Sequence, residues 1–197
     1  MKNGCVLCGG VGSGKSLTAI SYYYLLNHGD KRFLQGGNFV PMGGPQKDLY
    51  IITTARKRDT MEWEKELMPF LLSPNPIDSY YDCRVVIDSW NNVHKYVDAK
   101  NAFFIFDEQR VVGKGVWVKS FLKIAKNNEW ILLSATPGDT WEEYIPLFIA
   151  NGFFKSRSQF IQEHVIYSHC SKFPKIERYL GEKKLERLRD MILVDMD

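Results

Sequence analysis

The sequence lacks the segments that would insert the chain into a membrane or direct it out of the cell. No apolar run approaches the roughly 20 residues that a membrane-spanning helix requires. The first residues show no basic, apolar leader with a small-residue cleavage site of the secretory kind. We therefore expect a soluble, cytoplasmic chain without a membrane partner.

Cysteine and histidine are also scarce, with four residues of each. The cysteines are scattered, as in proteins of reducing compartments, and do not form a disulfide framework. Cys5 and Cys8 have zinc-ligand spacing, but residues 4–8 predict a buried strand, in which residues three apart point to opposite faces. No second cysteine pair follows at the usual distance, and the histidines match no metal-binding or catalytic spacing, so we expect no structural metal.

Neither sign of charge dominates the chain. Lys and Arg number 26 against 23 Asp and Glu, which leaves a formal net charge of +3. The hydrophobic fraction of 45% and the aromatic fraction of 14% are those of ordinary globular proteins, which excludes disordered, collagen-like and low-complexity chains. A chain of this size buries about 70% of its unfolded surface, so one compact domain is the default expectation.

Short apolar runs alternate with amphipathic segments along most of the chain. The apolar runs are continuous, which is typical of parallel strands that are buried on both faces of a sheet. Repeated strand, helix, strand units therefore predict an α/β fold with right-handed crossovers. The expected strands are residues 4–8, 48–53, 83–87, 102–107 and 130–134, and the expected helices are residues 15–27, 59–70, 89–97 and 116–127.

Two changes of pattern divide the chain. Residues 29–47 are rich in glycine and proline and predict a long surface loop, either functional or a tolerated insertion. After Pro137 the pattern becomes helical and aromatic, with a last amphipathic segment over residues 181–194. We therefore expect a sheet-containing lobe over residues 1–150 and a helical extension over residues 151–197.

A glycine-rich motif follows the first predicted strand. Residues 9–16 read Gly-Gly-Val-Gly-Ser-Gly-Lys-Ser, which fits the P-loop pattern, in which backbone amides and a helix N-terminus cradle phosphates. Lys15 is the candidate bridge between the β and γ phosphates, and Ser16 is a candidate Mg²⁺ ligand. The alternative is a glycine-rich turn with an incidental lysine. The predicted nucleotide-binding residues are Gly10, Val11, Gly12, Ser13, Gly14, Lys15, Ser16 and Leu17.

Two adjacent carboxylates follow the apolar run at residues 103–106. Asp107 and Glu108 stand at the carboxyl end of this strand, the side on which open α/β sheets bind ligands. In a P-loop protein the first carboxylate completes the Mg²⁺ shell, and the second can orient or deprotonate the attacking water. We assign Asp107 to the metal and Glu108 to the water, and with Lys15 they form the predicted catalytic set.

Two further segments point to a family. Residues 131–137 read Ile-Leu-Leu-Ser-Ala-Thr-Pro, and residues 51–56 read Ile-Ile-Thr-Thr-Ala-Arg, followed by Trp63 and Glu66 in a Trp-x-x-Glu arrangement. With the P-loop as motif I and Asp-Glu as motif II, the chain resembles superfamily 2 helicases and translocases, most of all the Swi/Snf-type enzymes and their phage-encoded relatives. The resemblance covers about residues 4–150.

This resemblance implies a three-layer, RecA-like P-loop NTPase lobe with a mostly parallel central sheet and a helical C-terminal extension. It implies ATP and Mg²⁺ as ligands, and coupling of hydrolysis to movement through motif III, here Ser134, Ala135 and Thr136. It also implies DNA or RNA as partner, a role in phage replication and a place in the host cytoplasm if the chain is phage-encoded. Motif Ia would grip the phosphate backbone with Thr54, Arg56 and Lys57, whose alternative is a solvated basic turn.

Motifs IV to VI and their arginine fingers, which the family carries on a second RecA-like lobe, have no counterpart in the 197 residues. We expect that lobe in the same full-length chain or in another subunit, and slow ATP turnover without it. Motif II also continues as Asp-Glu-Gln-Arg, which departs from the family's common endings. Two alternatives stay open: another P-loop motor, such as a phage DNA-packaging ATPase, and a nucleotide-gated binding module without turnover of its own.

Overall fold

The computed structural model describes residues 1–28, 47–107, 111, 113–136, 138–168 and 175–196. Its centre is a six-stranded sheet with the order β3-β2-β4-β5-β1-β8, in which every neighbouring pair is parallel. The strands are β1 (Cys5–Cys8), β2 (Leu49–Thr53), β3 (Val85–Ser89), β4 (Phe103–Asp107), β5 (Glu129–Ser134) and β8 (Leu193–Asp195).

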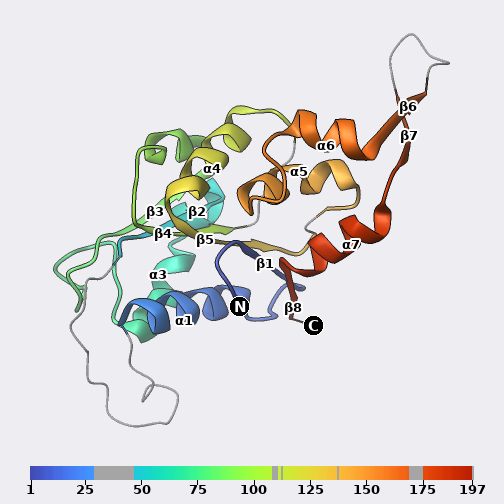
Figure 1. The fold of residues 1–197 in the computed structure, drawn as a ribbon. Coiled ribbons are helices and arrows are strands. Elements are labelled where there is room, and N and C mark those ends of the chain that lie inside the picture. Colours follow the sequence, from blue (N-terminus) through green and yellow to red (C-terminus); the bar gives the residue numbers. More distant parts are fainter. Residues whose placement is uncertain (29–46, 108–110, 112, 137, 169–174, 197) are drawn as a thin grey trace.

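Helices cover both faces of this sheet, so the fold has three layers (Figure 1). The layer that contains α1 and α3 packs on one face, and η3, α4, α5 and α6 pack on the other. The helices are α1 (Lys15–His28), α2 (Ala55–Asp59), α3 (Glu62–Leu67), η2 (Met68–Phe70), η3 (Trp90–Tyr96), α4 (Val116–Asn127), α5 (Trp141–Ala150), α6 (Arg157–His164) and α7 (Glu182–Asp190).

Alternate side chains of each strand pack into two separate hydrophobic cores. On β4, Phe103 and Ile105 join the core under α1 and α3, whereas Phe104 and Phe106 join the core under α4 and α5. All four side chains are fully buried, as expected for a parallel strand between two helical layers. The α/β fold with a parallel central sheet, predicted from the sequence, is therefore confirmed.

The predicted elements match the structure best where a long apolar pattern defined them. All five predicted strands are present, with β3 lying two residues later than expected, and the helices at 15–27 and 116–127 are present as α1 and α4. The single helix expected over 59–70 is instead broken, because Met61 adopts a left-handed conformation (φ 54°) between α2 and α3. The segment at 89–97 forms the 3₁₀ helix η3.

The C-terminal extension contains the expected helices and, in addition, three strands. Strands β6 (Val165–Ser168) and β7 (Lys175–Tyr179) form an antiparallel hairpin that projects from the body of the fold (Figure 1). After α7 the chain returns to the central sheet, where β8 pairs with β1. Whether the chain divides into two domains at residue 150 stays a prediction.

The loop predicted at 29–47 lies outside the described residues except for Lys47, and so do Glu108 and Pro137. Within the part of the chain that the structure describes, no helix is both long and apolar enough to cross a membrane.

Candidate nucleotide-binding site

The glycine-rich motif forms the turn between β1 and α1. Gly12 and Gly14 have φ angles of +84° and +82°, a conformation that side chains with a Cβ rarely adopt. An added Cβ at either position would meet no atom within 4 Å, so the backbone angle, rather than crowding, is what requires glycine there. The turn therefore has the conformation that lets successive backbone amides face one point at the start of a helix.

The Lys15 side chain folds back over this turn. Its Nζ donates hydrogen bonds to the carbonyl oxygens of Gly9 at 2.6 Å and Gly10 at 2.5 Å, and lies 3.4 Å from the Ser13 hydroxyl. These backbone carbonyls occupy the positions around the Lys15 ammonium that the oxygens of an anion could occupy. Lys15 is held within the turn that was predicted to bind phosphates.

Asp107, at the end of β4, collects donors from several segments. Its Oδ2 accepts hydrogen bonds from the Thr53 hydroxyl at 2.8 Å, the Lys57 ammonium at 3.1 Å and the Trp63 indole N–H at 3.1 Å. The Trp90 indole N–H donates a hydrogen bond to the backbone carbonyl oxygen of Asp107 at 3.0 Å. Only 2% of the Asp107 side chain is exposed, so these donors replace water around a buried carboxylate.

Strand order explains how the motifs meet. Parallel strands end at the same edge of a sheet, and β5 lies between β4 and β1, so motif III stands between the Asp107 strand and the P-loop strand. In the register, Asp107 pairs with Leu133, and Cys8 pairs with Ser134. The Ser134 hydroxyl is buried and accepts a hydrogen bond from the Thr136 amide at 3.1 Å, which fixes the turn after β5.

A pocket of about 340 Å³ opens where these segments converge, within the size range of small-molecule sites. It unites motifs I, Ia, II and III, which lie far apart in the sequence. Glu66 is a lining residue that had been singled out only as part of the Trp-x-x-Glu pattern. The lining residues are Val11, Gly12, Gly14, Lys15, Ser16, Leu17, Lys57, Glu66, Asp107 and Ala135.

The three residues expected to contact nucleic acid do not form one surface. The Thr54 hydroxyl caps α2 by accepting a hydrogen bond from the Lys57 amide at 3.3 Å. The Arg56 side chain is exposed, whereas the Lys57 ammonium turns inward to Asp107. The sequence did not indicate this inward turn, nor the bond between Trp63 and Asp107, although the spacing of Trp63 and Glu66 places both on one side of α3.

No protein-family model and no curated protein matches the sequence. Among solved structures, the Sulfolobus solfataricus SWI2/SNF2 ATPase core in complex with dsDNA is similar, with a TM-score of 0.66 and 14% identity. The match covers 98% of this chain and 40% of that one. The Pyrococcus furiosus Hef helicase domain gives a TM-score of 0.46 and 16% identity, over 76% of this chain and 33% of that one.

The chain thus spans less than half the length of either of these structures. At this level of identity, the likeness to the SWI2/SNF2 core establishes the fold. The chain therefore has a three-layer α/β fold of the RecA-like kind, with a parallel sheet between two helical layers.

Proposed function

We propose that the chain binds Mg-ATP and is the ATP-binding motor lobe of a nucleic-acid-dependent ATPase, a DNA helicase or translocase. The observation that carries this proposal is the pocket lined by the P-loop, Lys57, Glu66, Asp107 and Ala135. A P-loop alone indicates phosphate binding. Its convergence with an acidic strand end and with motif III is what a hydrolytic motor site needs.

The residues present fit the two ligands. The glycine turn and the start of α1 suit a polyphosphate, and the Ser16 hydroxyl and Asp107 carboxylate are oxygen donors of the kind that Mg²⁺ prefers. When bound, Mg²⁺ would neutralise charge that develops on the phosphate oxygens. Ser16 and Asp107 are the residues that would hold it.

The protein's own groups have separate roles in this proposal. Lys15 exchanges the carbonyls of Gly9 and Gly10 for phosphate oxygens, because an anion attracts its ammonium more strongly than a neutral carbonyl does. Thr53 and Trp63 hold the Asp107 carboxylate in place before a metal binds. Glu108 would accept a proton from the attacking water or orient that water.

Hydrolysis tests this assignment. Glu108→Gln should retain Mg-ATP binding while single-turnover hydrolysis falls at least about a hundredfold, since general-base contributions are of this order. Nucleotide binding is measured by fluorescence of a labelled ATP, and hydrolysis by release of labelled phosphate. Hydrolysis by the variant at the parent rate would remove Glu108 from the water-handling role.

Parent turnover separates the proposed motor from its alternatives. The 197-residue chain should hydrolyse slowly, because arginine fingers supplied by a second RecA-like lobe are worth about 10³- to 10⁵-fold. Binding without any single-turnover hydrolysis, with or without DNA, would instead indicate a nucleotide-gated module. A packaging motor should form rings, so a monomeric mass in light scattering would count against that alternative.

We further propose DNA as the partner, supported by the similar SWI2/SNF2 core, which was solved with dsDNA. Arg56 is exposed on α2, at the end of β2, and Thr54 and Lys57 lie in the same turn. Arg56→Ala should weaken duplex binding and lower the salt slope by about one counterion, because a phosphate contact is lost. RNA, the alternative partner, is titrated in parallel.

Arg84→Ala is a matched control for this change. Arg84 is also exposed, but it precedes β3, which is parallel to β2. It therefore lies near the amino ends of these strands, whereas Arg56 lies near their carboxyl ends. If both variants weakened DNA binding equally in a titration at several salt concentrations, motif Ia would not be the contact region.

A further inference from the structure

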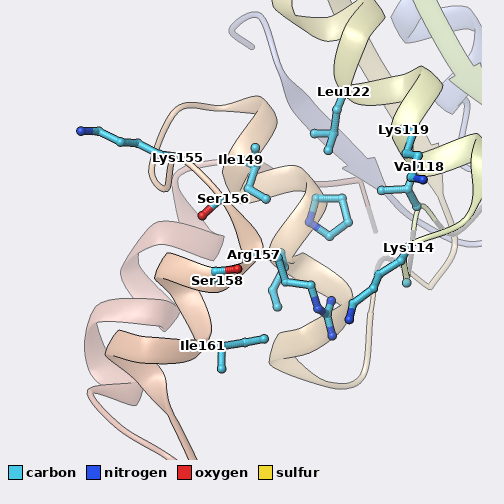
Figure 2. A pocket seen from close by; sticks show the side chains of 13 residues that line it. Lys114, Val118, Lys119, Leu122, Ile149, Lys155, Ser156, Arg157, Ser158 and Ile161 are labelled. Carbon is cyan, nitrogen blue, oxygen red and sulfur yellow. The ribbon is translucent and has the colours of Figure 1, made fainter.

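A second cavity, of about 480 Å³, lies on the outer helical layer between α4, α5 and the start of α6. We name it the α4–α6 cleft. It shares no lining residue with the nucleotide pocket. Figure 2 shows Val118, Lys119 and Leu122 of α4 on one wall, and Ile149 with the segment from Lys155 to Ile161 on the other.

The base of the cleft is aliphatic. Leu122, Ile149 and Ile161 are only partly buried and pack against the core beneath α4 and α5. Exposed apolar surface is unfavourable by about 25 cal/mol per Å², so this base favours an apolar occupant over water. The aliphatic lining residues are Val118, Leu122, Ile145, Pro146, Ile149 and Ile161.

The rim of the cleft is cationic. Lys114, Lys119, Lys155 and Arg157 line it, and the described lining includes no Asp or Glu. The three lysine ammonium groups form no ion pair with any residue that the structure describes. A positive rim above an apolar base therefore faces solvent without compensation from within the cleft.

Arg157 adds an unsatisfied donor at this rim. Its Nη2 pairs with Glu142 of α5, whereas its Nε is buried and has no hydrogen-bond partner among the described residues. A buried donor without a partner is costly.

The positive charge continues beyond the cleft. A neighbouring hollow beside the β6–β7 hairpin shares Lys114, Arg157 and Ile161 with it, and adds Lys175 and Arg178. Two carboxylates, Glu142 and Glu177, also line this hollow, so cations outnumber acids there by four to two. A ligand longer than one side chain would thus meet cations along its path.

We propose that the α4–α6 cleft binds an acidic segment of a partner protein, which places aliphatic side chains against Leu122 and Ile149 and carboxylates against the rim. The pattern is that of an amphipathic segment in a hydrophobic groove, with charge complementarity at its edge. Nucleic acid fits less well. Single strands bind by stacking bases on aromatic side chains; the described lining of the cleft contains none, and Tyr167 and Tyr179 line only the neighbouring hollow.

The test uses the full chain and a fluorescein-labelled acidic peptide of about 12 residues with two leucines one helical turn apart. Fluorescence anisotropy should show saturable binding. Replacing both leucines with serine should weaken it about tenfold or more, because the apolar contribution is lost. Equal affinity for the two peptides, or no binding of the leucine peptide, would overturn the proposal.

Two lysines on α4 supply a matched pair of variants. Lys119 lines the cleft, whereas Lys123 is also exposed on the same helix but does not line it. Lys119→Glu should weaken peptide binding about three- to tenfold, and Lys123→Glu should leave it within about twofold. Equal effects of the two changes would mean that general surface charge, and not the cleft, binds the peptide.

The isoleucine methyl groups locate the peptide without any substitution. In a methyl-labelled sample, Ile145, Ile149 and Ile161 should shift on titration, whereas Ile20 and Ile51, buried in the core beneath α1, should not. A short DNA duplex and a single strand are titrated in parallel. Shifts of the cleft methyl groups by DNA that displaces the peptide would overturn the proposal in favour of a nucleic-acid surface.

Discussion

One oxygen of Asp107 gathers three donors that come from β2, α2 and α3. A buried carboxylate without partners would be strongly destabilising, so these donors are needed for the fold whether or not a nucleotide is bound. Lys57 supplies the opposite charge, and Thr53 and Trp63 supply neutral hydrogen bonds. The residues that would prepare the metal site are therefore also stabilising residues.

Removing one neutral donor should be measurable. Thr53→Val keeps the shape of the side chain but removes the hydrogen bond to Asp107, and should lower the free energy of unfolding by about 1–2 kcal/mol. Urea unfolding is the measurement. Thr60→Val is the control, because the hydrogen bonds of the Thr60 hydroxyl to Arg56 and Glu62 are exposed to solvent. This change should lower the free energy of unfolding by less than about 0.5 kcal/mol. Equal losses would show that Asp107 does not need the Thr53 bond.

The elements that could be predicted are those whose burial produces a continuous apolar run or a regular apolar pattern in the sequence. Each strand from β1 to β5 is a continuous apolar run, and α4 alternates lysines with core residues. By contrast, β6 is only partly buried and β7 is mostly exposed, with polar residues along it, so no long apolar run marks this hairpin. The inward turn of Lys57 depends on its contact with Asp107, which is 50 residues further along the chain, so local sequence does not indicate it.

The 3₁₀ helix η3 is tied to β3 by Asp88. The Asp88 carboxylate accepts hydrogen bonds from Asn92 at 2.8 Å, Tyr96 at 2.6 Å and Arg58 at 3.2 Å. Burial acts to raise the pKa of Asp88, but these hydrogen bonds and one from the Ser89 amide outweigh it and hold the pKa below its usual value. The ionised form is thus the one that stabilises the folded state.

This direction of shift sets a pH dependence. A lowered pKa contributes stability above the unfolded value near 3.9, and that contribution is lost as the pH falls through the folded value. Asp88→Asn should therefore reduce the free energy of unfolding by about 1 kcal/mol near pH 7, and the difference from the parent should shrink below about pH 4. Urea unfolding at several pH values measures it, and a difference that grew on acidification would contradict the account.

At the scale of the whole molecule, the sheet order brings together segments that the sequence keeps apart. The P-loop, the Asp107 strand end and motif III were identified from local patterns, and parallel strands must carry them to one edge of the sheet. The pocket confirms that these segments meet. The two proposed binding regions lie in different parts of the fold, with the nucleotide at the strand ends and an acidic partner on the outer layer of α4, α5 and α6.

Nucleotide binding should stabilise the molecule as a unit, because the pocket draws on α1, α2, α3, the end of β4 and the turns after β1 and β5 together. Mg-ATP at about 100 times its Kd adds about 2.7 kcal/mol to the free energy of unfolding. For a domain of this size that corresponds to a rise in Tm of about 5–10 °C. Thermal unfolding with and without Mg-ATP measures this rise, and an unchanged Tm at saturating nucleotide would contradict it.

Titration calorimetry of Mg-ATP into the parent chain and into Lys15→Ala measures directly whether the P-loop binds the nucleotide. Lys184→Ala, which changes an exposed lysine of α7, is the control. One-site binding is expected for the parent and the control, and no detectable binding for Lys15→Ala, because the variant lacks the cation that contacts the phosphates. Binding of equal affinity by all three chains, or by none, would contradict this expectation.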